Sequence, residues 1–148
     1  MALMRSDTWL NTVTVNGALF PLADGGVWDT FKGGDVDSSA DVYHAGGMAP
    51  QEVVGGQPTI STVTLDKALD LQADWASVQQ LMVGGPGTVG NASITIHRQP
   101  LDINKNPSGT PLIYNGIVKS CAPGDTDSNK SDIQMWSITA VVNGPVGT

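Results

Sequence analysis

Residues branched at Cβ dominate this sequence, and this bias limits the possible folds more than any other feature. Val, Ile and Thr together number 36 of 148 residues, whereas Glu occurs once and Arg twice. Branched side chains pack well on pleated strands, and the unbranched residues that favour helices are scarce. The composition therefore predicts a mainly β chain. Its length fits one domain, residues 1–148, with one hydrophobic core.

The charge balance restricts the partners of the chain. Seven basic and fourteen acidic residues give a net charge of −7, with no basic run. Nucleic-acid readers gain affinity by neutralising phosphates with Lys and Arg, so this class is disfavoured. Only 14% of the residues are charged, fewer than normally coat a soluble monomer. We therefore expect a partner to cover part of the surface.

The sequence contains no membrane or secretion signal that we can recognise. No stretch reaches the roughly 20 apolar residues of a membrane span, and the first seven residues lack the apolar core of a signal peptide. We expect no membrane insertion and no secretion. A lone cysteine, Cys121, excludes an internal disulfide framework and a zinc knuckle.

Alternation and turn residues predict a series of strands. Trp9 to Val15 is the first, and Asn16-Gly17 favours a tight hairpin turn into Ala18 to Phe20. Further strands are expected over Trp28 to Phe31, Thr59 to Leu65, Ala92 to Gln99, Pro111 to Ser120 and Ile133 to Val142. The last two should pair as an antiparallel hairpin.

Two segments depart from this pattern. Asp35 to Gln57 is polar, rich in paired glycines and weakly periodic, which predicts a long loop. A loop of this length in a small domain is usually functional or ordered by a partner. One helix is expected near Asp70 to Val83, because four apolar residues repeat at helical spacing: Leu71, Trp75, Val78 and Met82. The element order predicts an α+β fold, a small antiparallel β-barrel or sandwich with one flanking helix.

No motif that would support catalysis or a cofactor survives closer inspection. Gly85, Gly87 and Gly90 have the spacing of a dinucleotide-binding turn, but the expected helix precedes them instead of following. His44, His97 and Cys121 share no spacing, and Glu52 has no obvious carboxylate partner. We therefore expect no enzyme and no cofactor.

Two acidic segments imitate a calcium loop. Asp35, Asp37, Ser39 and Asp41 alternate in the first, and Asp125, Asp127, Asn129 and Ser131 in the second. Both lack the glycine at the sixth position and the glutamate at the twelfth that an EF-hand requires. Solvated acidic loops are the favoured interpretation, with weak calcium binding left open.

As a whole, the pattern resembles the tail tube proteins of bacteriophages and their relatives in contractile injection systems. The resemblance rests on the early hairpin, Trp9 to Phe20, the long polar segment, the helix over Leu71 to Met82, and the closing hairpin. In the closing hairpin, residues 114–120 lead through an acidic loop to residues 131–139. The resemblance spans most of the chain and does not rest on an invariant motif.

The resemblance implies a structural role. In that family six subunits close a ring, rings stack into a tube, and inner strands line a channel for DNA. It also implies that the chain is assembled into a virion tail in the host bacterial cytoplasm. The implied partners are the tape measure protein, baseplate or tail-tip proteins, the terminator and, in contractile tails, the sheath protein. A long loop contacts neighbouring rings, and here it would include Gly34, Asp35, Asp37, Asp41, His44, Glu52 and Gly56.

Strand alternation, combined with this resemblance, predicts which side chains line the channel. Ile94 and Ile96 suit a core, as do Trp136 and Ile138, and the intervening residues are small and polar: Ser93, Thr95, His97, Ser137 and Thr139. Such a wall offers phosphate no fixed cation. The alternatives are the inner tube of an injection system and, less favoured, a carbohydrate-binding or adhesion module that uses the tryptophans as a sugar platform.

Overall fold

The structure, a computed structural model, describes residues 4–5, 7–21, 25–84, 86–125, 127–129 and 131–147. It is mainly β with one helix, as predicted. The elements are β1 (Trp9–Val15), β2 (Ala18–Leu19), β3 (Val27–Trp28), β4 (Thr30–Gly33), β5 (Val36–His44), β6 (Gln51–Ile60), β7 (Val63–Ala68), α1 (Leu71–Met82), β8 (Ser93–Pro100), β9 (Leu112–Ala122) and β10 (Met135–Gly147).

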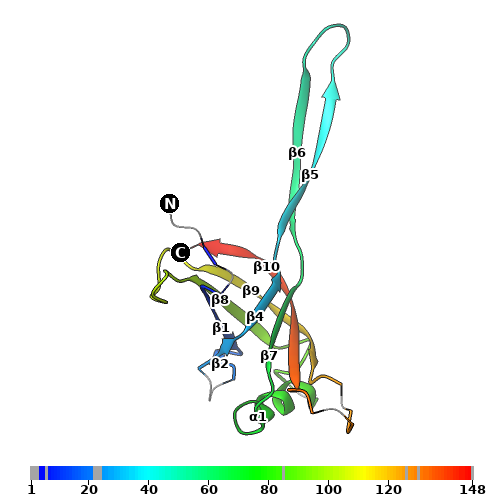
Figure 1. Cartoon of the computed structure of the whole chain (residues 1–148). Helices are drawn as coiled ribbons and strands as arrows, with labels where there is room; N and C mark the ends of the chain where they lie inside the picture. The colour runs from blue at the N-terminus through cyan, green and yellow to red at the C-terminus, as the bar shows by residue number, and fades with distance from the viewer. Residues whose placement is uncertain are drawn as a thin grey trace.

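Eight strands form one antiparallel sheet that wraps around the core (Figure 1). Its order is β2-β1-β8-β9-β10-β7-β4, with β3 also paired to β1. The path of hydrogen-bonded strands does not return to its start within the described residues, so the barrel that was one of the two expected forms is not closed. The expected strand over residues 28–31 is two short strands, because the chain leaves β1 at Asp29 and joins β7 as β4.

Local signals placed most of the strands correctly. Asn16 and Gly17 have positive φ values of 52° and 84°, as a tight hairpin turn between β1 and β2 requires. β9 and β10 pair antiparallel, as expected, with a register shift near Thr139. The strand expected over residues 59–65 is instead the end of β6 and the start of β7, separated by Ser61 and Thr62.

One cluster of buried apolar side chains fills the inside of the sheet. Alternate residues of β1 and β8 supply its aliphatic part, including Val13, Ile94 and Ile96, all at most 1% exposed. Trp28 and Trp136 lie at its centre, with ring centroids 4.7 Å apart. The indole of Trp28 donates to the carbonyl of Phe20 at 2.9 Å.

The predicted polar loop over residues 35–57 is a second, two-stranded sheet formed by β5 and β6. Figure 1 shows this hairpin projecting from the body on the side away from α1. The loop prediction was wrong because both faces of the ribbon are exposed, so its sequence carries no alternation between buried and exposed residues.

Helix α1 forms where it was expected. Asp70 caps its start by accepting from the backbone N–H of Gln72 and Ala73 at 2.9 and 3.3 Å. At 12 residues, it is not long and apolar enough to cross a membrane, and no other helix occurs in the described part of the chain. The helix covers the end of the core near the start of β8.

Candidate assembly surfaces

The five residues expected to line a channel lie on one face of the sheet. Ser93, Thr95 and His97 of β8 alternate with buried Ile94 and Ile96. Ser137 and Thr139 of β10 alternate likewise with buried Trp136, Ile138 and Ala140. Because β9 pairs with both strands, all five point away from the core on the same side. The strand alternation that the sequence predicted is present; the channel itself remains a proposal.

This outward face is rich in hydroxyl and amide groups. Thr95 pairs with Thr14 of β1 and with Asn115 of β9, and its hydroxyl donates to Asn115 Oδ1 at 3.0 Å. Thr139 lies opposite Ser120. Across β1, β8, β9 and β10, Lys119 at the register shift is the one fixed charge that is exposed beside this face. Apart from Lys119, this face offers phosphate no fixed cation.

Hairpin β5–β6 carries most of the residues expected to contact neighbouring rings. Asp35, Asp37, Asp41 and His44 are exposed on its first strand or just before it, and Glu52 and Gly56 on its second. Gly34 is the exception. It is buried at the root of the hairpin with φ +72°, and a Cβ there would lie 3.0 Å from the ring of Tyr114. Its conformation serves the fold, so Gly34 is not available for contact with another ring.

The two faces of the hairpin near its tip differ in chemistry. Residues directly opposite one another share a face, so Val42 and Val53 form an apolar pair that is 49% and 69% exposed. The other face carries Asp41 beside Val54 and Tyr43 beside Glu52. A two-stranded ribbon with no core of its own is marginally stable in water. These exposed apolar residues are therefore a candidate surface for contact with a partner.

The exposed side of α1 is a second apolar surface. Of the predicted stripe, only Val78 is buried in the core, whereas Leu71, Trp75 and Met82 are 74%, 43% and 52% exposed. The stripe is expected to pack on the sheet or on an adjacent subunit; Val78 packs on the sheet, and contact of the other three with an adjacent subunit stays a prediction. The side that packs is made of Asp74, Ser77, Val78 and Leu81.

A buried ion pair explains why polar residues occupy the packed side of the helix. Lys67 Nζ of β7 lies 2.9 Å from Asp74 Oδ1 and 5.9 Å from the ring centroid of Trp28. The second oxygen of Asp74 accepts from the backbone N–H of Asp70 at 2.9 Å. Sequence periodicity missed this pair because its two members lie on different elements.

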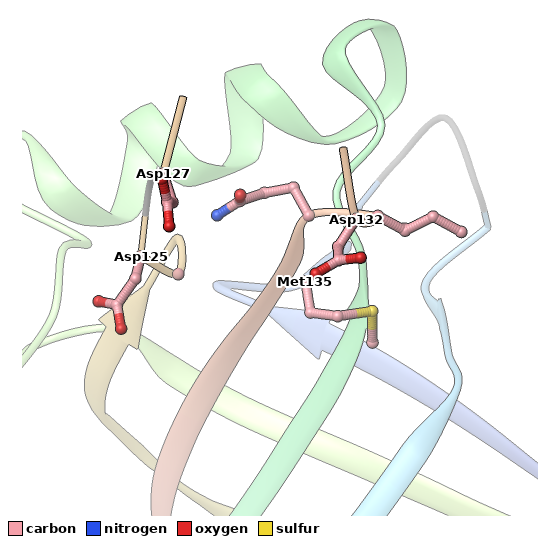
Figure 2. Close-up of a pocket in the computed structure, with 7 residues that line it drawn as sticks. Asp125, Asp127, Asp132 and Met135 are labelled. Atoms are coloured by element: carbon pink, nitrogen blue, oxygen red, sulfur yellow. The ribbon is translucent and has the colours of Figure 1, made fainter. Parts of the chain in front are cut away.

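The acidic loop before β10 surrounds a shallow pocket of about 350 Å³ lined by Asp125, Asp127, Asp132 and Met135, among others (Figure 2). Asp127 accepts from the backbone N–H of Asn129 at 3.0 Å, which fixes a local turn. Within the described residues, no three acidic, His or Cys side chains gather closely enough to hold a metal ion. The other imitation of a calcium loop is largely part of strand β5.

The residues considered for catalysis are not brought together. His44 lies in the hairpin. His97 pairs with Ile113 near the start of β9, whereas Cys121 lies near the end of β9 and pairs with Ile138. Burial raises the pKa of the Cys121 thiol to about 11, so this group is a poor nucleophile at neutral pH. Gly85 lies outside the described residues, and Gly87 and Gly90 follow α1 in a loop.

The fold is similar to that of several solved structures. A chain of the anti-feeding prophage baseplate, 6-fold symmetrised, aligns with 100% of this chain and 97% of its own length at 11% identity, with a TM-score of 0.69. A chain of the cap that terminates the anti-feeding prophage tube aligns over 100% and 92% at 14% identity, with a TM-score of 0.66. A chain of the PVC sheath-tube complex, from an extracellular contractile injection system, aligns over 99% and 91% at 14% identity, with a TM-score of 0.63.

At these identities the similarity defines the fold. The chain has the tail tube-like fold found in tube, terminator cap and baseplate components of contractile injection systems, as the sequence resemblance predicted. No protein-family model matches the sequence, and no curated protein matches it.

Proposed function

We propose that this chain is a structural subunit of a phage tail tube, which closes six to a ring, stacks in rings and conducts DNA through the lumen during genome ejection. The solved structures with this fold are components of tubes, caps and baseplates, which supports a structural role over an enzymatic one. The proposal includes assembly in the host bacterial cytoplasm into the virion tail.

Hairpin β5–β6 is the observation that carries the assembly proposal. Its residues are exposed on both faces, apart from the partly buried Ile60, and it reaches away from the body. Nine or ten strand residues span about 30 Å, enough to reach well onto a neighbouring subunit. The apolar pair Val42 and Val53 gains burial only if a second protein covers it. Contact between rings provides that cover.

The outward face of the sheet supports the conduit. The face carries Ser, Thr and Asn side chains, which hydrate well, beside the exposed Ile117 and Val141, and the net charge of −7 disfavours retention of DNA. With β8, β9 and β10 facing inward in each of six subunits, this face would form the bore. Among the five residues expected to line the channel, His97 is the one with an ionisable ring.

The second candidate function is the inner tube of a contractile injection system, and the similarity to components of the PVC and anti-feeding prophage particles favours it. The partners in either case would be a tube terminator, baseplate or tail-tip proteins and a tape measure protein, with a sheath in the contractile case. Particles purified from producing cells separate the two: DNA-filled heads indicate a phage, and headless tubes indicate an injection system.

Electron microscopy of the purified chain over a range of concentrations tests the proposal. We expect closed rings and, at higher concentration, tubes of uniform bore. Sedimentation should show the loss of the 15.4 kDa species as rings form. Particles that stay monomeric under several salt conditions would contradict the proposal and favour a carbohydrate-binding or adhesion module.

A further inference from the structure

A pocket opens where the chain crosses from β3 to β4. β3 pairs with Asn11 and Thr12 of β1, after which β4 joins β7 on the other edge of the sheet. In the described residues, no strand therefore covers the start of β1 on that side. The pocket that results has a volume of about 600 Å³, and Trp9, Asn11, Phe31 and Arg98 are among the residues that line it.

Arg98 is held in this pocket by aromatic rings. Its Cζ lies 4.4 Å from the ring centroid of Trp9 and 4.4 Å from that of Phe31. These cation–π contacts fix the position of the guanidinium without using its N–H groups. Its Nε is buried and has no hydrogen-bond partner among the described residues. The Nε–H group is thus a buried donor that is left unpaired among the described residues.

Asn11 supplies a second unsatisfied atom at the same place. Asn11 pairs directly with Arg98 across β1 and β8, it is 5% exposed, and its Oδ1 has no hydrogen-bond partner among the described residues. Buried polar atoms in native proteins are nearly always paired. Two buried polar atoms of directly paired residues, a donor on Arg98 and an acceptor on Asn11, are therefore both left without a hydrogen bond among the described residues.

The acidic side chains of the pocket do not serve Arg98. Asp7 pairs with Arg5 at 3.2 Å and with Lys105 at 3.6 Å. Asp29 accepts from the backbone N–H of Ala68 at 3.5 Å. Of the six basic residues in the described part of the chain, four form ion pairs: Arg5, Lys32, Lys67 and Lys105. Of the other two, Lys119 is exposed, and Arg98 is the one that lies half-buried in a pocket.

We infer that the Arg98 pocket receives a carboxylate side chain from a second copy of this chain. The inference rests on the proposed function, because it names a contact between tube subunits. A guanidinium edge matches a carboxylate with two N–H donors. A peptide segment that bears the carboxylate also brings backbone N–H groups, one of which satisfies Asn11 Oδ1. A protonated phosphate carries its O–H donor on the same small ion, whereas a peptide segment supplies the carboxylate and the N–H from separate groups, so we infer an acidic peptide as the ligand.

The acidic face of the hairpin is the segment that fits. Asp41 and Glu52 project from adjacent cross-strand pairs on one side of the ribbon, outside the body of their own subunit. Neither carboxylate forms an ion pair in the described structure. The chain has twice as many acidic as basic residues, so carboxylates are in excess and the fixed cation is the scarcer partner.

Assembly of variants tests the contact. Arg98→Gln should raise the concentration at which rings form by about tenfold or more, the factor that corresponds to ~1.4 kcal/mol. Arg98→Lys should recover part of the loss, because it keeps the charge without the planar edge. Lys119→Gln is the matched control and should change the concentration at which rings form by less than about twofold. Asp41→Asn combined with Glu52→Gln should reproduce the effect of Arg98→Gln; an unchanged assembly concentration would overturn the hairpin as the source of the carboxylate.

A binding measurement keeps the inference testable if Arg98→Gln fails to fold. Below the assembly concentration, N-acetyl-aspartate N-methylamide should shift the arginine Nε–H resonance that Arg98→Lys removes, and inorganic phosphate should not. No shift with either compound would overturn the pocket, and an equal response to phosphate would overturn the acidic peptide as its ligand. Wild-type chain that never assembles contradicts the proposed function, whereas assembly that does not depend on Arg98 contradicts only this inference.

Discussion

The ammonium group of Lys67 donates to Asp74 Oδ1 at 2.9 Å, and the two side chains are only 7% and 0% exposed. This pair joins β7 to the first turns of α1. Asp74 also accepts from the backbone N–H of Asp70, the capping residue, so one carboxylate orients the helix and fixes its start. The attachment of the helix thus depends on a charge pair as well as on Val78 and Leu81.

Removal of one member of this pair should be costly. Asp74→Ala leaves the Lys67 ammonium group buried without its carboxylate, which we expect to lower the free energy of unfolding by about 3–5 kcal/mol. Lys32→Met is the matched control, because its pair with Asp66 is exposed and should be worth less than about 1 kcal/mol. Urea unfolding measures both. Equal losses in the two variants would show that burial of the pair adds nothing.

Trp75→Ala should have a small effect on the isolated chain. A half-exposed side chain loses only part of the transfer free energy of 1.5–3 kcal/mol, so we expect about 1 kcal/mol. Leu81→Ala, in the packed side of the helix, should cost about 2–5 kcal/mol. Thermal unfolding compares the two. A larger loss for Trp75→Ala would mean that its ring is buried in solution.

Hydrogen exchange should distinguish the free hairpin from the assembled one. Backbone amides of β5 and β6 should exchange rapidly in the monomer, because the ribbon has no core, and much more slowly in the tube. Val53→Lys should impair assembly while leaving the unfolding midpoint of the monomer nearly unchanged. Exchange that is equal in both states would remove the hairpin from the contact between rings.

A positive charge on the outward face should slow DNA passage. Thr95→Lys or Thr139→Lys repeats one cation six-fold around the proposed bore and lets it bind phosphate. Genome ejection in an otherwise intact phage should slow, and added salt should relieve the effect. Asn104→Lys, in an exposed loop away from this face, is the control. Normal ejection at all salt concentrations would place Thr95 and Thr139 outside the lumen.

The Cys121 thiol should resist alkylation. Its pKa of about 11, against an ordinary 9.0, lowers the thiolate fraction at pH 8 by about 100-fold. Iodoacetamide should label the folded chain far more slowly than the chain in urea. Because the folded pKa is raised, this group's contribution to stability is constant below pH 9 and falls as the pH rises towards 11. Equal labelling rates in both states would contradict the burial.

The sequence was most informative where one face of an element meets the core. Ile94 and Ile96 alternate with polar residues because one face of β8 is buried. Asn16 and Gly17 determine the turn between β1 and β2 through local backbone preferences. The stripe located the helix, but local patterns could not reveal which other residues of α1 pack on the sheet. Asp74 could be buried only because Lys67, on another element, neutralises it.

The hairpin and the Arg98 pocket show the same limit in other forms. β5 and β6 are stabilised by their mutual pairing, so neither strand shows an apolar face in its own sequence. Arg98 continues the inward face of β8 beyond Ile96, but its aromatic contacts come from β1 and β4, which meet it only after the sheet wraps. Contacts between segments far apart in the sequence therefore determine these two features, and periodicity within a single segment does not predict them.

The chain enters the hairpin at Gly34 and Asp35 and leaves it at Ser61 and Thr62, and at its root Ile60 packs against the core. Insertion of one residue into each strand near its tip at Gly46 and Gly47 would lengthen the ribbon by about 3.4 Å and leave the core unchanged. In a tube of such subunits, mutation could therefore alter the axial repeat independently of the inner diameter. The spacing between rings and the width of the channel would then be free to evolve separately.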